Sequence, residues 1–512
     1  MFSCFPYRRD AQERLRSGRK VPVAACLPLE SKADELFRAV DFKAPCLLLE
    51  SCRTHPVTGR YSLIVGEPSA VLTARGNRIT LESSQGTRSW EGDPLGEMQR
   101  ILDRRRAVRP AGFPPFVGGA VGFLGYDACR HVEPISLKSK EDMNLPDLGF
   151  LFCDEAIVLD HLEEKLWVIA LADPSGDLDR SYDEAVARVE RLRKRITRTS
   201  GTISRSFPPS IGVEGRLQRE SDPRFREDDV RRFQSTHTRA EFERMVREAK
   251  RFISDGEIYQ VNLSQRFSMP LAQEPWELYR RIRAINPSPF AAYADFGGFQ
   301  ILSGSPERLL RVQGRRVETR PIAGTRPKGR TAVETARLRQ ELILNEKERA
   351  EHLMLVDLER NDLGRVCRYG SVRVDEFMVL EEYSHVIHIV SNVRGVLRPS
   401  VRPVDLIAAA FPGGTITGCP KIRSLEVIDS LEPVRRKLYT GSLGYISASG
   451  EIDFNLLIRT AVVAESQVHV QAGAGIVADS DPGKEYEETV HKAQALLEAL
   501  DADAAPVAAV SV

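Results

Sequence analysis

Short apolar runs rich in Leu, Ile, Val and aromatic residues recur through the first two hundred residues, separated by Gly, Pro and charged positions. Runs of this length and composition predict β-strands. They lie at residues 45–51, 60–68, 156–161 and 165–173. Apolar residues at helical spacing predict helices near residues 94–107 and 181–197. Residues 1–198 are therefore expected to form a strand-rich N-terminal domain.

The pattern changes at residues 199–235, where Ser, Pro, Gly and charged residues replace the periodic apolar positions. This composition is typical of a linker or a long surface loop. We place a domain boundary there, followed by a second domain at residues 236–503 and a flexible tail at residues 504–512.

The second domain opens with an N-cap signal at residues 236–240 and a helix-spaced apolar pattern that ends at Gly256. Strands are predicted after it, at residues 259–267, 290–297, 299–312, 315–324, 439–450, 454–466 and 468–480. Strands and helices cluster along the chain and do not alternate. This order favours an α+β architecture over a Rossmann-type parallel sheet.

Composition and charge narrow the function classes. Among 512 residues, 42% are hydrophobic and 28% charged, as in a soluble globular protein, and 73 basic residues balance 72 acidic ones. The net charge of +1 gives no reason to expect nucleic acid or an anionic membrane surface as a partner. No apolar run reaches the roughly 20 residues of a membrane helix, so we expect a cytoplasmic protein. The eight cysteines lack CxxC spacing, which indicates neither a zinc site nor a disulfide framework.

Two segments repeat one carboxylate spacing. Glu348 and Glu351 lie three residues apart, as do Glu485 and Glu488, and neither segment contains Gly or Pro between its acids. On helices, each pair shares one face. Two such pairs facing each other suit Mg²⁺, which prefers oxygen ligands and an anionic substrate. The alternative for either pair alone is an ordinary solvated helix face.

Three glycine-rich segments occur at residues 117–127, 412–421 and 472–480. None has the spacing of a P-loop or a dinucleotide-binding turn, so a nucleotide fold is not expected. In the second segment Thr415 offers a hydroxyl, and Lys421 begins a helix whose N-terminus favours an anion. The segment therefore fits a carboxylate-binding turn as well as it fits a simple tight turn before a helix.

Two residues of the strands predicted next could complete a carboxylate site. Arg459 can form a bidentate clamp, and Tyr439 can supply an orienting hydroxyl. Taken singly, each is more often an ordinary strand residue.

Seven ordered motifs together resemble the chorismate-binding enzymes, a family that includes anthranilate, aminodeoxychorismate, isochorismate and salicylate synthases. They read SPERLL, PIAGTRPKG, ERAEHLMLVDLERNDLGRV, YSHVIHIVS, FPGGTITGCPK, GSLGYISASGEIDFNLLIRT and QAGAGIVADS followed by EYEET. The resemblance covers residues 236–503. The N-terminal segments LLLES, GRYS and GGAVGFLGYD resemble the companion domain of the amine-forming members.

The resemblance implies two packed antiparallel β-sheets flanked by helices, as in anthranilate synthase component I, with Mg²⁺ bridging the ring carboxylate of chorismate to protein acids. Its metal-site acids match Glu348, Glu351, Glu485 and Glu488. Glu307 matches the general acid that assists departure of the 4-hydroxyl group. A carboxyl in that role needs a raised pKa.

Other matched positions surround the substrate. His388 lies beside the reacting ring in the family, and Thr325 and Gln260 are grouped with it as catalytic residues. The residues that hold the substrate match Thr415, Tyr439, Arg459, Gly475 and Lys492.

The nucleophile separates the members of the family. Those that use water carry a lysine base where this chain has Gln260, so the resemblance implies ammonia, supplied by a separate glutamine amidotransferase subunit. The core signatures favour aminodeoxychorismate synthase component I, which forms 4-amino-4-deoxychorismate for p-aminobenzoate and folate synthesis. Ala323 departs from the pattern, since many of these enzymes have a lysine there that is proposed to attack the ring. The alternative is anthranilate synthase component I, which forms anthranilate and pyruvate for tryptophan synthesis.

A tryptophan pocket is a further expectation from the resemblance. Glu50 and Ser51 of LLLES, with Asn286 and Pro287 of NPSPF, match segments that line such a pocket between the domains. A remote alternative is therefore an inactive regulatory protein that binds an amino acid. The presence of all four metal-site acids together with Glu307 argues against it.

Overall fold

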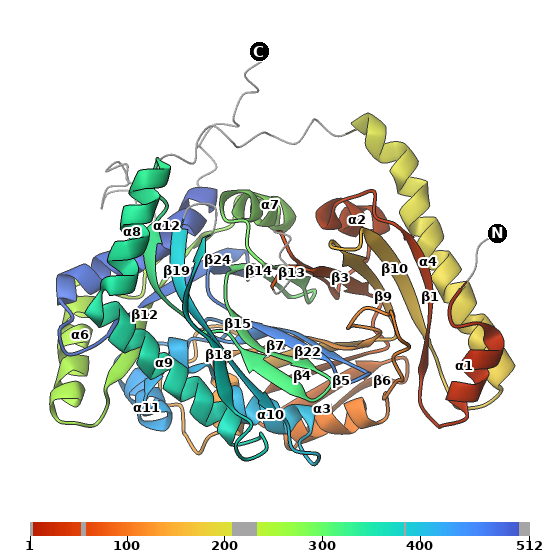
Figure 1. Cartoon of the computed structure of the whole chain (residues 1–512), viewed down its shortest axis with the longest axis horizontal. Helices are drawn as coiled ribbons and strands as arrows, with labels where there is room; N and C mark the ends of the chain where they lie inside the picture. The colour runs from red at the N-terminus through yellow and green to blue at the C-terminus, as the bar shows by residue number, and fades with distance from the viewer. Residues whose placement is uncertain (1–3, 53–57, 207–232, 383–385, 501–512) are drawn as a thin grey trace.

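The computed structural model describes residues 4–52, 58–206, 233–382 and 386–500 (Figure 1). Most of the predicted linker, residues 207–232, and the whole predicted tail lie outside the described residues. The helix predicted to end near residue 197 continues to Ser206. Within the described ranges, no helix is both long and apolar enough to cross a membrane.

One antiparallel sheet, the first sheet, contains twelve strands. In spatial order they are β1 (Val21–Pro28), β10 (Lys165–Ala172), β9 (Glu155–Asp160), β3 (Tyr61–Gly66), β2 (Cys46–Glu50), β13 (Phe290–Asp295), β14 (Phe299–Ser305), β23 (Thr460–Ala464), β24 (Gln467–Ile476), β12 (Gln260–Pro270) and β11 (Gln234–Ser235), with β20 (Gly418–Cys419) also paired to β12.

The second sheet also contains twelve strands and is also antiparallel. Their order is β17 (Ile322–Pro327), β19 (Val386–Val396), β16 (Arg316–Thr319), β15 (Arg308–Gln313), β22 (Ile452–Leu456), β21 (Ser442–Ser447), β7 (Gly119–Leu124), β8 (Leu148–Cys153), β4 (Ala70–Arg75), β5 (Arg78–Ser83) and β6 (Gly86–Glu91), with β18 (Arg373–Glu382) also paired to β19.

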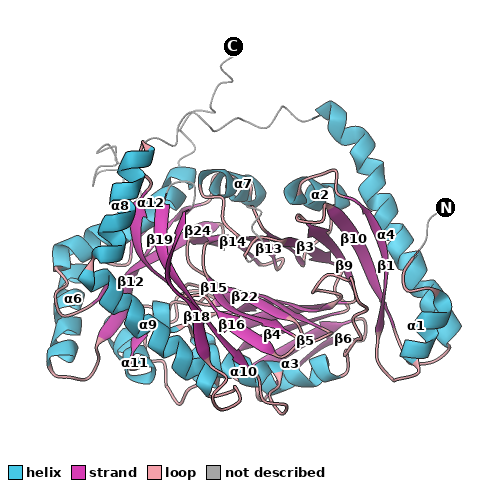
Figure 2. Ribbon diagram, in the orientation of Figure 1, coloured by secondary structure: helices cyan, strands magenta, loops and turns pink. Residues whose placement is uncertain are grey.

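Helices cover the outer faces of both sheets (Figure 2). They are α1 (Arg8–Leu15), α2 (Ala33–Val40), α3 (Pro94–Asp103), α4 (Leu178–Ser206), α6 (Arg239–Ser254), α7 (Pro275–Ile285), α8 (Ala332–Leu344), α9 (Glu346–Gly364), α10 (Pro403–Ala410), α11 (Lys421–Leu431) and α12 (Pro482–Leu500), with 3₁₀ turns η1 (Tyr126–His131) and η2 (Gly414–Ile416). This arrangement confirms the expected α+β class, with two packed antiparallel sheets flanked by helices.

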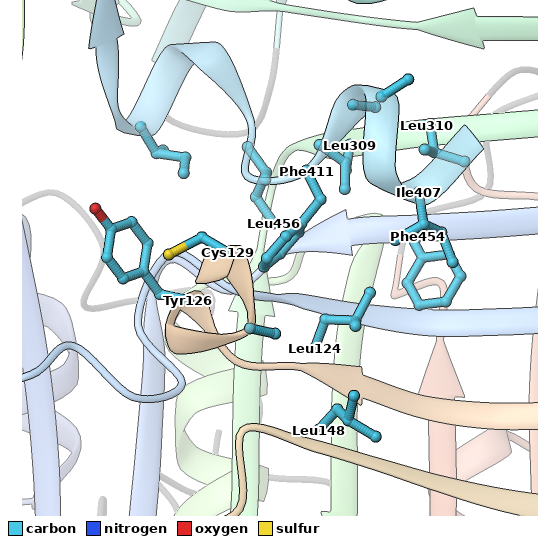
Figure 3. Packing of buried hydrophobic residues seen from close by; sticks show 14 of the residues in the cluster. Leu124, Tyr126, Cys129, Leu148, Leu309, Leu310, Ile407, Phe411, Phe454 and Leu456 are labelled. Atoms are coloured by element: carbon cyan, nitrogen blue, oxygen red, sulfur yellow. The ribbon is translucent and has the colours of Figure 1, made fainter. Parts of the chain in front are cut away.

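Three large apolar clusters hold these layers together. One lies between the first sheet and helices α1, α2, α4, α7 and α12, and another lies between the two sheets. The third lies under α3, α9, α10 and α11, where Ile407 and Phe411 pack near Leu124, Leu148 and Phe454 (Figure 3). Each large apolar side chain buried in this way contributes about 1.5–3 kcal/mol.

Strands from both sides of the predicted linker pair with each other. In the first sheet β2 pairs with β13, and in the second sheet β7 pairs with β21. Each sheet is therefore built from both the segment before residue 207 and the segment after residue 232. The division of the chain into two domains stays a prediction. The two segments that it separates contribute strands to both sheets.

Helix capping places two of the predicted site acids. Asn345 caps α9, because its side chain accepts a hydrogen bond from the Glu348 N–H at 3.0 Å. Glu348 is consequently held in the first turn of the helix, and Glu351 follows one turn later on the same face. The predicted N-cap signal before the second domain is also present, since Thr238 caps α6 in a capping box with Glu241.

Two apolar runs predicted as single strands each cross from one sheet to the other. Residues 299–312 form β14 in the first sheet and β15 in the second, with Pro306 and Glu307 at the crossover. Residues 454–466 form β22 and β23 in the same way, with Arg459 at the crossover in a left-handed conformation (φ +50°). Backbone hydrogen bonds join the two crossovers, from Leu456 N–H to the Glu307 carbonyl at 3.0 Å and from Gly304 N–H to the Arg459 carbonyl at 2.9 Å.

The strand positions predicted for Arg459 and Tyr439 are therefore wrong. Arg459 lies at the crossover between β22 and β23, and Tyr439 lies in the turn before β21. An unbroken apolar run does not show where a chain leaves one sheet for another, because both sheets bury the same residue types.

Candidate active site at the sheet crossovers

Glu307 is the buried acid at the first crossover. Its side chain is 7% exposed, and the Thr415 hydroxyl of η2 donates to its Oε1 at 3.0 Å. The pKa of Glu307 is raised to about 7, because burial outweighs the hydrogen bonds from Thr415 and the Ile322 backbone and the charge of Lys492. A carboxyl with this pKa holds a proton near neutral pH and can donate it, as a general acid must.

His388 and Thr325 face each other on neighbouring strands of the second sheet. They are paired residues of β19 and β17, and His388 Nδ1 lies 3.0 Å from the Thr325 hydroxyl. A bulge at Gly324 (φ +71°) precedes Thr325, and a Cβ at Gly324 would lie 2.7 Å from Glu348 Oε2. Burial lowers the pKa of His388 to about 4, so the imidazole is neutral at physiological pH.

The two carboxylate pairs lie on helices, as predicted, within the first two turns of α9 and α12. Glu348 forms an ion pair with Arg326 at 2.9 Å, and Glu351 accepts a hydrogen bond from Gln260 Nε2 at 3.0 Å. Burial raises the pKa of Glu351, and the charges of Glu348 and Glu488 raise it further. Acids of α9 and α12 therefore repel each other across one site.

On α12, Glu488 forms an ion pair with Lys492 at 2.6 Å. Burial raises the pKa of Glu485, and the charge of Glu488 adds to that effect. Within the described residues, no three His, Cys, Asp or Glu side chains are already arranged to hold a metal ion. The donor chemistry nevertheless fits a hard divalent cation, because carboxylates that repel one another are stabilised by one, and three of these four are at least partly buried.

Lys492 lies at the centre of the site. Its ammonium group donates to the Gly473 carbonyl at 3.1 Å and lowers the pKa of Glu307, Glu351 and Glu485. The second crossover adjoins it, since the Arg459 guanidinium donates to the Lys492 carbonyl. Lys492 thus connects the buried acid with both carboxylate helices.

Strands β12 and β24 form another wall. The Gln260 amide lies over Gly475, where an added Cβ would be 2.8 Å from Gln260 Nε2. The Tyr439 hydroxyl lies over Gly473 in the same way, 2.9 Å from an added Cβ. Burial raises the pKa of Tyr439, so its hydroxyl stays protonated. All thirteen residues predicted as catalytic, substrate-binding or metal-binding are connected by these contacts or by the charge interactions among them; their roles stay predictions.

Lys421 differs from the expectation. Its ammonium group binds Asp362 of α9 at 2.6 Å, and its side chain is only 9% exposed. The charge at the start of α11 is therefore satisfied by a carboxylate of the protein. Of the two residues predicted to bind a carboxylate at this turn, only Thr415 is therefore available.

A cavity of about 310 Å³ lies between the sheets beside the LLLES strand. Glu50, Ser51, Pro289 and Phe290 are among its lining residues. The other two residues predicted for a tryptophan pocket do not line it. Asn286 donates instead to the Gly304 carbonyl at 3.0 Å, and Pro287 follows it in the connection to β13.

The Glu50 carboxylate already has charged and polar partners within the protein. Arg283 binds both of its carboxylate oxygens at 2.7 Å, and the Tyr279 hydroxyl donates at 2.8 Å. Ser51 donates to the Tyr61 carbonyl at 2.8 Å. These contacts fix the wall of the cavity.

Sequence reasoning missed two residues of the candidate site, Arg326 and Asn262, and one that supports it, Arg436. Arg326 pairs with Glu348, and its place directly after Thr325 in PIAGTRPKG was a usable signal. Asn262 lies two residues after Gln260, and strand alternation places both on one face. Arg436 is 2% exposed and donates to the carbonyls of Ile416 and Asn262, which no local pattern could reveal.

Comparison with known proteins agrees with this architecture. Residues 44–498 match the chorismate binding enzyme family. Aminodeoxychorismate synthase component 1 of Bacillus subtilis is 41% identical over 96% of this chain and 98% of its own length. Anthranilate synthase component 1 of Acetivibrio thermocellus is 40% identical over 91% of this chain and 92% of its own length. The crystal structure of anthranilate synthase component I from Streptococcus pneumoniae TIGR4 aligns with a TM-score of 0.70 at 33% identity, covering 87% of this chain and 94% of that one.

The chain belongs to the chorismate binding enzyme family, which confirms the resemblance seen in its motifs. Within that family it is a chorismate-utilising enzyme of the anthranilate and aminodeoxychorismate synthase component I type.

Proposed function

We propose that the chain is component I of an aminodeoxychorismate synthase, which converts chorismate and ammonia into 4-amino-4-deoxychorismate and water. The observation that carries this proposal is Glu307, a buried carboxyl with a pKa of about 7, held by Thr415 and facing Lys492. The 41% identity to the Bacillus subtilis relative along almost the whole chain supports it.

In this mechanism Glu307 donates its proton to the 4-hydroxyl group as the carbon–oxygen bond breaks, and the group leaves as water. Ammonia then forms the new carbon–nitrogen bond. Neutral His388 lies beside the ring as a hydrogen-bond partner, and Lys492 and Arg459 orient the carboxylates of the substrate. A positioned acid of this kind contributes roughly 10²–10⁴-fold to the rate.

Mg²⁺ fits the carboxylates of α9 and α12, and we propose that they hold it. The ligand set would be Glu348, Glu351, Glu485 and Glu488. A bound Mg²⁺ supplies charge neutralisation at the ring carboxylate of the substrate. Mg²⁺ would compete for Glu348 with Arg326 and for Glu488 with Lys492, and weaker ion pairs would leave both cations available to the carboxylates of chorismate.

Ammonia is the proposed nucleophile because no lysine base occupies the Gln260 position, and an amide cannot deprotonate water. Ala323 is buried in β17 and has no nucleophilic group, so addition to the ring is direct. A separate glutamine amidotransferase subunit supplies ammonia in this proposal, since a dry route prevents competing attack by water.

Anthranilate synthase component I is the second candidate. Relatives with that name are as similar as the aminodeoxychorismate synthase, at 40% identity over 91% of the chain for Acetivibrio thermocellus. The 310 Å³ cavity beside Glu50 and Ser51 also suits a tryptophan regulator.

The deciding experiment incubates the purified chain with chorismate, Mg²⁺ and ammonium chloride at alkaline pH. Products are separated by chromatography, with and without added aminodeoxychorismate lyase. We expect 4-amino-4-deoxychorismate, which the lyase converts to p-aminobenzoate. Fluorescent anthranilate formed without the lyase would replace the proposal with the second candidate, and a Mg²⁺ chelator should abolish either product.

A further inference from the structure

Strand β12 presents two amide side chains to the active site from one face. Gln260 and Asn262 are two residues apart, so both project to the same side of the strand. In each, the amide oxygen is buried and has no hydrogen-bond partner among the described residues. A buried acceptor without a partner costs about 1–3 kcal/mol, so a ligand that donates to it is expected.

The orientation of the Gln260 amide is fixed by its neighbour. Its Nε2 donates to the Glu351 carboxylate at 3.0 Å, and only nitrogen can donate. Oε1 is consequently the free atom, although the side chain is only 4% exposed. The Oε1 atom of Gln260 is thus a preorganised hydrogen-bond acceptor that points away from the carboxylates.

Two glycines of β24 make room for these amides. A Cβ at Gly473 would lie 2.5 Å from Asn262 Oδ1 and 2.9 Å from the Tyr439 hydroxyl, and a Cβ at Gly475 would lie 2.8 Å from Gln260 Nε2. Any other residue at either position would displace an amide. The absence of a Cβ at both positions therefore lets the two amides lie against β24 beside Tyr439.

A ligand for these two oxygens must donate hydrogen bonds, and it must be small because both oxygens are buried. Neutral ammonia has three N–H groups for the two oxygens and keeps its lone pair for attack. Amides accept no proton at physiological pH, so these two side chains cannot activate water, which needs a base.

We propose that Asn262, together with Gln260, binds the ammonia nucleophile above Gly473 and Gly475. This inference rests on the proposed amination reaction. It assigns to Asn262 the selection of ammonia over water as the nucleophile.

The test replaces Asn262 with leucine, which has a similar volume and no polar atom. Initial rates are measured for the full chain against ammonium chloride at fixed pH and ionic strength, and separately against chorismate. For Asn262→Leu we expect the KM for ammonia to rise at least tenfold while the KM for chorismate changes less than twofold. The melting temperature should stay the same or rise, because the variant removes an unpaired buried oxygen.

Gln265 provides a matched control on the opposite face of β12. Its amide is buried but bonded at both polar atoms, since Nε2 donates to Thr489 at 2.6 Å and Oε1 accepts from Ser235 at 2.9 Å. Gln265→Met should lower the melting temperature and leave the KM for ammonia unchanged. The two variants therefore separate a loss of stability from a loss of the nucleophile.

Two outcomes would overturn the inference while leaving the amination reaction intact. In one, Asn262→Leu keeps the KM of the wild type for ammonia. In the other, the KM for chorismate rises in its place, which would assign Asn262 to a hydroxyl group of the substrate. If the wild type itself forms no aminated product, the proposed function fails first.

Discussion

Glu307 is a buried acid at the crossover between the sheets. Among the described residues, no Lys or Arg side chain lies within ion-pair distance of it. Folding removes this carboxyl from water without a compensating ion pair, and its pKa rises from 4.5 to about 7. The same environment that keeps the acid protonated for catalysis therefore makes its ionised form costly. Both consequences can be measured.

Glu307→Gln keeps the shape of the side chain and removes its proton-donating ability. We expect kcat to fall by about 10²–10⁴-fold with little change in the KM for chorismate. Steady-state kinetics with ammonia measures both. Glu451→Gln is a suitable control, because Glu451 is also buried and is paired with Arg109, but it lies just before β22, at the opposite end of that strand from the crossover. A near-normal kcat for Glu307→Gln would show that Glu307 is not the general acid.

The pH dependence of the rate follows from the same group. Glu307 must be protonated to act, so kcat/KM, expressed per neutral ammonia, should decline as the pH rises through about 7. The pKa of His388 is about 4, so this residue should add no ionisation above pH 5. A profile flat from pH 6 to pH 9 would contradict the assignment.

Stability should depend on pH through Glu307 as well. Its pKa is higher in the folded protein, so the folded state binds more protons between pH 4.5 and pH 7. The stabilising contribution is complete below pH 4.5 and is lost as the pH rises through 7. Relative to the wild type, Glu307→Gln should therefore gain up to about 3 kcal/mol of unfolding free energy between pH 5 and pH 8. Urea denaturation at the two pH values measures the difference.

At the scale of elements, strand β24 controls the site through its glycines. A Cβ at Gly475 would lie 2.8 Å from Gln260 Nε2 and 3.6 Å from Glu351 Oε1. The Gln260 amide must then move, and its hydrogen bond to Glu351 is lost. The effect comes from contact alone, because the backbone at Gly475 is not in the left-handed region.

We expect Gly475→Ala to lower kcat/KM at least tenfold without unfolding the protein. Gly298→Ala is the control, because an added Cβ there meets no atom within 4 Å. Kinetics and circular dichroism of both variants test this. Equal activity of the two would show that the close approach of β24 to Gln260 is dispensable.

The elements also show which features sequence patterns predict and which they do not. Strands β2, β3, β9 and β10 were predicted because each is a short apolar run between polar turns. The crossovers at Glu307 and Arg459 were not, since a strand that changes sheets keeps the same apolar pattern. Helices α9 and α12 were predicted with their acids, because i,i+3 spacing is a local property.

At the scale of the whole molecule, the two segments of the chain share both sheets. The β2–β13 and β7–β21 pairs would become exposed edges if the segments were separated, and the core between the sheets would open. We expect residues 233–512 expressed alone to aggregate.

Co-expression of residues 1–206 with residues 233–512 should restore a soluble complex with ammonia-dependent activity. Size-exclusion chromatography and the chorismate assay measure this outcome. A soluble, active fragment 233–512 on its own would instead support two independent domains.

The sequence by itself determined the α+β class, the family, most strand and helix positions, and the residue types of the site. These are local properties, because periodicity, caps and motif spacing need no knowledge of distant contacts. Only the tertiary structure decided that Glu307 and Arg459 lie at neighbouring crossovers, that Lys421 is occupied by Asp362, and that Asn262 faces the site. Each of these depends on pairing between residues more than fifty positions apart, which burial and sheet order fix after the chain has folded.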